Sequence, residues 1–221
     1  MSALVEADEL YRFFHSGGEE TRALRGVSLR VAAGEITAVT GPSGSGKSTL
    51  LACIAGLDEP DGGLVCIAGE PLSRRPEAER ARLRSRCIGM LFQSGNLVDH
   101  LTVRRNMELV QSIHGRVDRR RCNEVLDSLG LADRAGANPP QLSGGEAARA
   151  GLAIAIANDP PVLLADEPTG ELDGATEHAV LSLLRSRAKA GAAILVVTHS
   201  PAVAALADHT IALRDGQVTT S

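Results

Sequence analysis

Aromatic side chains are scarce in this 221-residue sequence, which has no tryptophan, one tyrosine and three phenylalanines. Proteins that hold single-stranded nucleic acid usually stack the bases on aromatic rings, so this scarcity argues against that function. The formal net charge of −4 also argues against wholesale nucleic-acid binding. We therefore expect no nucleic-acid partner.

Paired cysteines and long apolar runs are also missing. Four cysteines are scattered without a C-x-x-C pair, which favours reduced thiols in a cytosolic protein over a zinc site or a secreted disulfide scaffold. No apolar run approaches the roughly 20 residues that cross a bilayer, and the N-terminus MSALVEADEL is acidic rather than signal-like. If the protein works at a membrane, we expect a partner to supply the span.

A glycine-rich stretch fits the pattern G-x-x-x-x-G-K-[S/T]. It consists of Gly41, Pro42, Ser43, Gly44, Ser45, Gly46, Lys47 and Ser48, with Thr49 after it. An expected buried strand (residues 36–40) precedes it and an expected apolar helix start (residues 50–55) follows, which is the setting of a phosphate-binding loop. Lys47 would reach the β- and γ-phosphates of a nucleoside triphosphate, and the Ser48 hydroxyl would bind Mg²⁺. The chain has only two lysines against twenty-one arginines, and one of the two is at the position where a planar guanidinium would fit poorly.

Two adjacent carboxylates follow a second apolar strand, expected over residues 162–165. Asp166 would hold Mg²⁺, directly or through water, and Glu167 would polarise the attacking water. A strand-to-loop turn is the alternative interpretation, but ionisable neighbours in a chain with a phosphate-binding loop favour catalysis. Glu171, Leu172 and Asp173 come next, and Asp173 could simply cap the following helix.

Two further expected strands end in polar residues, at residues 88–92 before Gln93 and at residues 194–198 before His199. Ligands of open α/β sheets lie at the carboxyl ends of parallel strands, so these groups should converge with the two sites above. Gln93 could sense the γ-phosphate side of Mg²⁺ or simply end its strand. His199 could contact the γ-phosphate or be a strand-end histidine satisfied by hydrogen bonds.

The segment Leu142-Ser143-Gly144-Gly145-Glu146 predicts a second phosphate site. Ser143 can cap a helix, and the alanine-rich run over residues 147–157 favours one. Amides at such a helix start, aided by the helix dipole, attract a phosphate. An ordinary capped helix is the alternative for this segment taken alone.

The remaining pattern divides the chain into parts. Residues 4–40 alternate short β-like stretches with turns at Gly17-Gly18 and Ala33-Gly34, which predicts an N-terminal antiparallel subdomain. Helical patterns at residues 103–114 and 119–129 predict a helical insertion over about 94–142. The C-terminus is expected to add one helix and a strand or hairpin.

In their order along the chain, these motifs resemble the nucleotide-binding subunit of ATP-binding-cassette (ABC) transporters. The motifs are GPSGSGKST, Gln93, LSGGE, VLLADEP, ELD and His199. Details such as AGLDEPDGG and ADEPTGELD resemble most closely the ATPases of the lipoprotein-releasing, macrolide-exporter and cell-division group. The resemblance covers essentially the whole chain. It implies a single α/β P-loop NTPase domain over residues 1–221, with a mostly parallel core sheet, an N-terminal antiparallel β-subdomain and a helical subdomain.

The same resemblance implies roles for single residues in a head-to-tail homodimer that forms on ATP binding. Ser143, Gly144 and Gly145, with Glu146 beside them, would close over ATP held by the Gly41–Thr49 loop of the other subunit. Glu167 would be the general base, and Lys47 and His199 would contact phosphates. The remaining assignments are Asp173 as a cross-dimer contact, Gln93 as a magnesium ligand and link to the membrane partner, and Phe14 as the ring stacked on adenine, with Tyr11 and Phe13 as competitors.

The function implied is Mg²⁺-dependent ATP hydrolysis at two composite sites, driving a separate integral-membrane permease from the cytoplasmic face of the cell membrane. Export or mechanotransmission is the expected type. A regulatory ATPase that controls a cell-wall enzyme through a membrane partner is the alternative. A DNA-repair or translation-type ABC protein is disfavoured, because such proteins usually carry a long coiled coil, zinc motifs or a second cassette.

Overall fold

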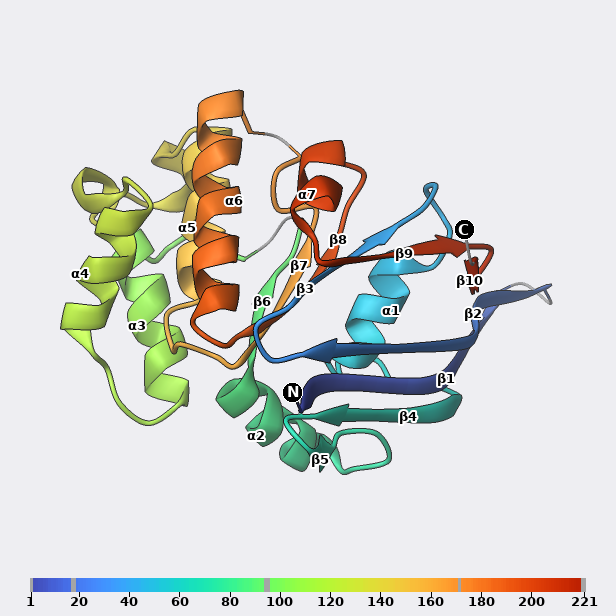
Figure 1. The fold of residues 1–221 in the computed structure, drawn as a ribbon. Coiled ribbons are helices and arrows are strands. Elements are labelled where there is room, and N and C mark those ends of the chain that lie inside the picture. The colour runs from blue at the N-terminus through green and yellow to red at the C-terminus, as the bar shows by residue number, and fades with distance from the viewer. Residues whose placement is uncertain (1, 17–18, 94–95, 171, 220–221) are drawn as a thin grey trace.

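The computed structural model describes residues 2–16, 19–93, 96–170 and 172–219 (Figure 1). Two sheets lie side by side with one helix between them, and five further helices gather on the far side of the larger sheet. The helix Glu77–Cys87 instead packs on the side of the smaller sheet, where Leu83 and Cys87 are buried. The expected turn at Gly17-Gly18 and the Glu171 position lie outside the described residues.

The smaller sheet is antiparallel and has four strands in the order β2-β1-β4-β5. They are β1 (Ala3–Ser16), β2 (Glu19–Ala32), β4 (Gly62–Ile67) and β5 (Glu70–Pro71). The β1/β2 register is irregular near its end, because Arg12 lies opposite Leu24 while Phe13 lies opposite Arg22. Ala23 is therefore an extra residue on β2, a β-bulge. The antiparallel N-terminal sheet is confirmed.

The larger sheet has six strands in the order β10-β9-β3-β8-β7-β6, and all but β10 run parallel. They are β3 (Ile36–Thr40), β6 (Ile88–Leu91), β7 (Val162–Asp166), β8 (Ala193–Val197), β9 (His209–Arg214) and β10 (Gln217–Thr219). Strands covered on both faces read as continuous apolar runs, and β8 is buried at all five positions. The mostly parallel core is confirmed. The sequence placed the ends of β6 and β8 one residue too late.

Seven α-helices are formed by the described residues: α1 (Lys47–Ile54), α2 (Glu77–Cys87), α3 (Val103–Ile113), α4 (Arg119–Ser128), α5 (Gly144–Ala155), α6 (Gly174–Lys189) and α7 (Pro201–Leu206). Side-chain caps explain where several begin. Thr102 accepts a hydrogen bond from the Arg105 amide at the start of α3, and Asp118 accepts one from the Arg121 amide at the start of α4. The expected starts of α3 and α4 are confirmed.

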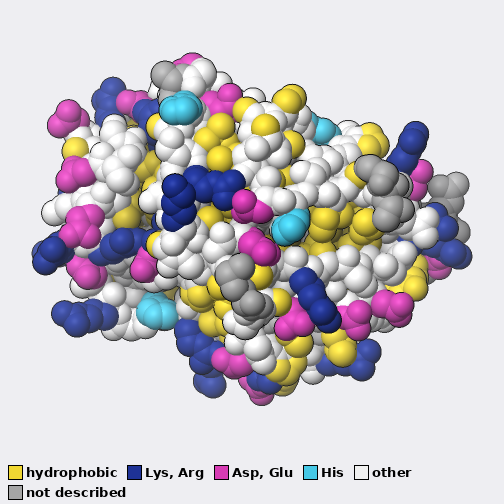
Figure 2. All heavy atoms as spheres, viewed as in Figure 1, with side chains coloured by type: hydrophobic (Ala, Val, Ile, Leu, Met, Phe, Trp, Pro, Cys, Tyr) yellow, Lys and Arg dark blue, Asp and Glu magenta, His cyan; other side chains and the backbone are white. Residues whose placement is uncertain are grey.

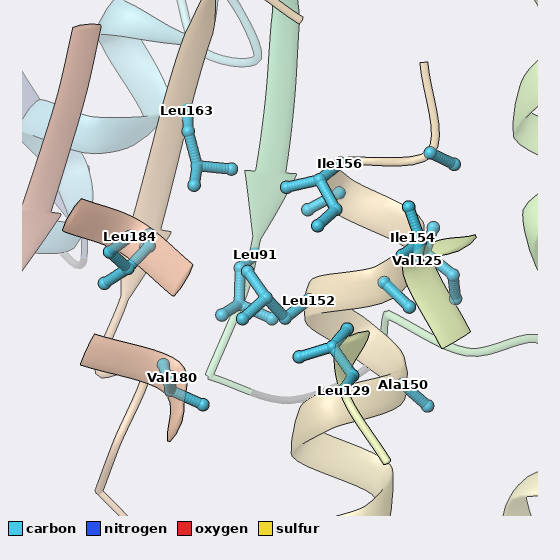
Figure 3. Packing of buried hydrophobic residues seen from close by; sticks show 14 of the residues in the cluster. Leu91, Val125, Leu129, Ala150, Leu152, Ile154, Ile156, Leu163, Val180 and Leu184 are labelled. Carbon is cyan, nitrogen blue, oxygen red and sulfur yellow. The ribbon is translucent and has the colours of Figure 1, made fainter. Parts of the chain in front are cut away.

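The larger sheet separates two hydrophobic clusters. Alternate residues of β8 serve opposite faces: Ile194 packs with the helical side, and Leu195 packs toward α1 and the antiparallel sheet. On the helical side, Leu152 of α5 lies against Leu91 of β6, with Leu163 of β7 nearby (Figure 3). The sheet is thereby fixed from both faces, and its carboxyl edge stays free for a site.

Charges on the surface are mixed. On the face in Figure 2, basic and acidic side chains lie beside one another. Ion pairs of the described chain include Arg12–Asp58, Arg80–Glu59 and Arg121–Asp159. Within the described ranges, no helix is both long and apolar enough to cross a membrane.

Candidate nucleotide-binding and catalytic site

A cavity of about 750 Å³ opens at the carboxyl edge of the larger sheet. It brings together most of the residues that the sequence singled out: Phe14, Ser43, Gly44, Gly46, Lys47, Ser48, Thr49, Gln93, Asp166, Glu167 and His199. They come from the ends of β1, β3, β6, β7 and β8 and from the start of α1. The expected convergence at one sheet edge is therefore observed. We call this space the P-loop cavity.

The P-loop, residues 41–49, is wedged between two strands. A Cβ at Gly46 would lie 2.3 Å from the carbonyl oxygen of Ala23, and one at Gly41 would lie 2.0 Å from that of Leu213. Gly46 also has a φ of +101°, which L side chains rarely adopt. Because Gly46 has no side chain to cap α1, the first-turn amides are available to an anion.

Lys47 is held within the loop that it serves. Its ammonium donates hydrogen bonds to the carbonyl oxygens of Gly41 and Pro42, both at 2.9 Å, and the residue is buried. These contacts point the charge at the centre of the loop. The ammonium has three N–H protons, so one remains for a bound phosphate.

Asp166, the last residue of β7, lies beside Ser48 in the P-loop cavity. Partial burial raises the pKa of the Asp166 carboxyl above its ordinary value; Ser48 counteracts this change and Glu167 adds to it. A nearby cation would offset the desolvation of the carboxylate.

The oxygen donors of the cavity suit Mg²⁺. Ser48, Gln93 and Asp166 all line it. No group of three His, Cys, Asp or Glu residues that could hold a metal occurs in the described part of the chain. This composition fits Mg²⁺, which usually takes one or two protein carboxylates and completes its shell with phosphate oxygens and water.

Glu167 follows Asp166 in a strained conformation, with a φ of +48°. Its Oε2 accepts hydrogen bonds from the Thr198 hydroxyl at 3.2 Å and from the His199 backbone N–H at 3.1 Å. Its Oε1 is buried and has no hydrogen-bond partner among the described residues. A buried carboxylate oxygen needs a partner, so this atom suits a reacting water. The His199 Nε2 lies 3.7 Å from the same oxygen.

Ser143 and the two glycines after it lie elsewhere. Ser143 caps α5, since its Oγ accepts a hydrogen bond from the Glu146 amide at 3.3 Å and Glu146 Oε2 accepts one from the Ser143 amide at 2.8 Å. That amide, aided by Arg134, holds the pKa of the Glu146 carboxyl below its usual range. Ser143 and Gly144 are exposed, and residues 143–146 are not among the described residues that line the P-loop cavity.

Asp173 caps α6. Its Oδ1 accepts a hydrogen bond from the Thr176 amide at 2.9 Å, and its Oδ2 accepts one from the Thr176 hydroxyl at 3.2 Å. The capping alternative considered for this residue is therefore observed. It leaves the assignment as a cross-dimer contact a prediction.

Of the three aromatic candidates near the end of β1, only Phe14 lines the P-loop cavity within the described chain, and it is 42% exposed. Tyr11 instead lies against Gly26 and Gly62, where an added Cβ would come within 2.9 Å of its hydroxyl and 3.3 Å of its ring, respectively. The structure also adds cavity residues that the sequence did not indicate: Thr21, Arg22, Ala23 and Arg25 on β2, and Asp215 between β9 and β10. The sequence does not show the bulge at Ala23, whose carbonyl lies against Gly46 of the P-loop.

Comparisons with known proteins all find ABC transporter proteins. The family model described as ABC transporter matches residues 24–170. A Thermotoga maritima protein named "Uncharacterized ABC transporter ATP-binding protein" is 41% identical over 221 residues, which is 99% of this chain and 94% of that protein. The "Macrolide export ATP-binding/permease protein MacB" of Shigella flexneri is 39% identical over 222 residues, or 99% of this chain. The chain spans only 34% of that relative.

Two solved structures of a bacterial cassette superpose closely. One is described as the dimeric structure of a bacterial ABC transporter cassette, and the other as a dimeric post-hydrolysis state bound to ADP and Pi. Each gives a TM-score of 0.93 at 36% identity, covering 98% of this chain and 97% of that one. The chain therefore belongs to the ABC transporter family, as one of its ATP-binding cassettes, an ATPase.

Proposed function

We propose that this ATPase works as a head-to-tail dimer with two composite sites, each made of the P-loop cavity of one copy and residues 143–145 of the other. One observation carries the proposal: within a single chain the P-loop cavity holds the phosphate loop, Asp166 and Glu167, while Ser143 and Gly144 face solvent outside it. The described dimer of a cassette 36% identical to this chain supports it.

The surface around residues 143–145 has room for another chain. A Cβ at Gly144 would have no heavy atom within 4 Å, and one at Gly145 would be 3.8 Å from Arg149 and Leu172. These glycines therefore serve no tight packing within their own copy. Small residues at a helix start let a phosphate approach the backbone closely, which suits a γ-phosphate presented by the second copy.

The proposed chemistry follows from the positions of the side chains. The P-loop amides and Lys47 bind the triphosphate, and the Phe14 ring stacks on the adenine. Glu167 Oε1 accepts a proton from water as the water oxygen attacks the γ-phosphorus and the bond to the β–γ bridging oxygen breaks. His199 contacts the γ-phosphate. Mg²⁺, when held by Ser48, Gln93 and Asp166, would neutralise charge that develops on the phosphate oxygens.

Two assignments concern the dimer contact. Asp173 lies at the start of α6, next to Leu172, whose side chain is close to Gly145. We place Asp173 at the contact with the second copy. Glu146 shapes the start of α5 by capping it, and it thereby orients the amides of residues 143–145.

We further propose that a membrane-spanning permease docks beside Gln93, which would place the cassette on the cytoplasmic face of the membrane. A groove of about 440 Å³ lies between α2, β6, α3 and α5, with Phe92 and Asn96 among its lining residues. Phe92 and Ile113 in this groove are 41% and 68% exposed. The name of the MacB relative joins an ATP-binding part to a permease. Residues 94–142, which include α3 and α4, would form the helical subdomain that carries one wall of the groove.

Protein concentration tests the composite site. We expect the ATPase rate per chain to rise with concentration, and ATP to shift the protein from monomer to dimer in size-exclusion chromatography when hydrolysis is blocked. A constant rate per chain from a species that stays monomeric would contradict the proposal. For the permease, a Phe92→Asp variant should keep basal ATPase activity and lose co-purification with membranes.

A further inference from the structure

We propose that Arg12 is a positioning residue that fixes the ring of Phe14 as the adenine platform and ties this platform to the helix that carries the P-loop. The inference rests on the proposed function, since it takes Phe14 as the residue that stacks on the base.

The first observation is the contact between the two side chains. The guanidinium carbon of Arg12 lies 4.8 Å from the centroid of the Phe14 ring, within the range of a cation–π interaction. Phe14 is 42% exposed and lines the P-loop cavity. The guanidinium covers one side of the ring, and the exposed remainder is available to the base.

The second observation is that the guanidinium is itself held firmly. Its Nε donates to Asp58 Oδ2 at 2.8 Å, and its Nη2 lies 2.8 Å from Asp58 Oδ1, which is a bidentate pair. Its Nη1 donates to Asp61 Oδ2 at 3.2 Å. Two carboxylates therefore fix the plane of the group, and its orientation is not left to an isolated rotamer.

Both carboxylates come from one turn, which connects them to α1. Asp58 and Asp61 belong to the turn that follows α1, and the Asp58 amide donates to the carbonyl of Ala52 within that helix. The turn also clamps the end of β1, because the Asp61 amide donates to the Tyr11 carbonyl at 2.9 Å and Asp61 Oδ2 accepts from the Phe13 amide at 2.7 Å. The P-loop at the start of α1 and the Phe14 end of β1 are thus both held in place relative to this helix.

This arrangement lowers the cost of binding the base. A phenyl ring at a strand end would otherwise lose rotational freedom when adenine stacks on it, and preorganisation removes part of that loss. Lysine cannot replace Arg12 in this role, since it lacks both the planar surface and the fork that matches Asp58.

The test separates the base from the phosphates. Dissociation constants for MgATP and for magnesium tripolyphosphate, which has no base, are measured by calorimetry on wild type, Arg12→Met and Arg12→Lys. We expect both variants to weaken MgATP about three- to fivefold, as loss of one exposed cation–π contact implies, and to leave tripolyphosphate unchanged. Arg30→Met is the matched control: Arg30 is on β2, pairs with Glu6 and is 78% exposed. It should change neither constant.

A double-mutant cycle completes the test. In a Phe14→Ala background, Arg12→Met should have no further effect on MgATP. Equal weakening of both ligands, or an Arg12 effect that persists without Phe14, would overturn the inference. If Arg12→Met does not fold, Asp58→Asn is used in the same cycle and should show a smaller loss of the same kind. Wild-type affinity in Phe14→Ala alone would instead refute the proposed adenine platform.

Discussion

The carboxylate of Glu167 is anchored by the backbone of His199, not by its ring: Oε2 accepts the His199 N–H at 3.1 Å, while the ring nitrogen Nε2 is 3.7 Å from Oε1. Substitution of the His199 side chain should therefore leave the proposed base in place. The two residues can be tested separately.

Glu167→Gln should lower turnover at least about 100-fold, because the amide keeps the shape of the side chain but cannot take the proton from water. ATP binding should persist, and the variant should accumulate as an ATP-bound dimer. Phosphate release and size-exclusion chromatography with ATP measure the two effects. Near-normal hydrolysis would remove Glu167 from its proposed role.

His199→Ala should also lower turnover, by about 100-fold, since it deletes one group proposed to contact the γ-phosphate. Glu167 should stay in place, because the backbone N–H that holds it remains. The affinity for ATP should stay near that of wild type, because the P-loop amides and Lys47 are proposed to bind the triphosphate. Parallel measurements of single-turnover rate and ATP dissociation constant check this. Unchanged turnover would mean that the ring only ends its strand.

Two inactive variants should restore each other if the site is shared between copies. Gly144→Arg has open space within its own chain, so it should fold and bind ATP but fail to close over a partner's nucleotide. In a mixed dimer, the Gly144→Arg chain supplies an intact P-loop cavity. The Glu167→Gln chain supplies an intact Ser143-Gly144-Gly145 segment. The mixture should regain part of the activity. A mixture as inactive as either variant alone would contradict a composite site.

Asp208 should give the fold a measurable pH dependence. Its Oδ2 accepts a hydrogen bond from the Ile36 amide at 2.8 Å, and this contact, opposed by partial burial and aided by Arg185, lowers the pKa of the Asp208 carboxyl. A lowered folded-state pKa adds stability above the unfolded pKa of about 3.9, which is lost as pH falls through the folded value. Asp208→Asn should therefore cost about 1 kcal/mol at neutral pH and less near pH 3, by urea unfolding. Asp133→Asn, at an exposed position, is the control. Its effect on the free energy of unfolding should not shrink between neutral pH and pH 3.

Thiol reactivity should follow burial. All four cysteines are free, and Cys66 is only partly buried, whereas burial raises the pKa of the Cys53 thiol to about 12. At pH 7.5 a maleimide should label Cys66 first, and Cys53 only on unfolding. Peptide mass spectrometry identifies the labelled residue, with Cys66→Ser as the control. Early labelling of Cys53 would mean that α1 does not bury this thiol as described.

Much of the fold follows from local signals in the sequence. The strand Ile36–Thr40 is found as expected, because an uninterrupted apolar run before a glycine loop has few other solutions. The starts of α3 and α4 are set by Thr102 and Asp118 within one turn of chain. Strand ends are less certain from sequence, and Asp166 belongs to β7 because it pairs with Val197.

Sequence motifs predict the cavity residues that directly follow a strand. They do not predict the residues that contacts between distant segments bring to the cavity. Most P-loop residues, together with Asp166 and Glu167, stand next to their own strands in the sequence. Arg12 and Asp58 are 46 residues apart, and no local pattern connects them. Arg22 and Arg25 reach the cavity through the bulge in β2, whose register depends on the pairing of β1 and β2.

The close approach of Gly46 to the Ala23 carbonyl has a mechanical consequence. β2 bears the cavity residues Thr21 and Arg25, and Thr21 lies opposite Phe14 in the sheet. A methyl group at position 46 would have to push this strand outward, since only 2.3 Å separates its place from the carbonyl. The wall proposed to receive the base would then move away from the loop proposed to receive the phosphates. The absence of a side chain at position 46 therefore keeps these two proposed parts of the site at their observed separation.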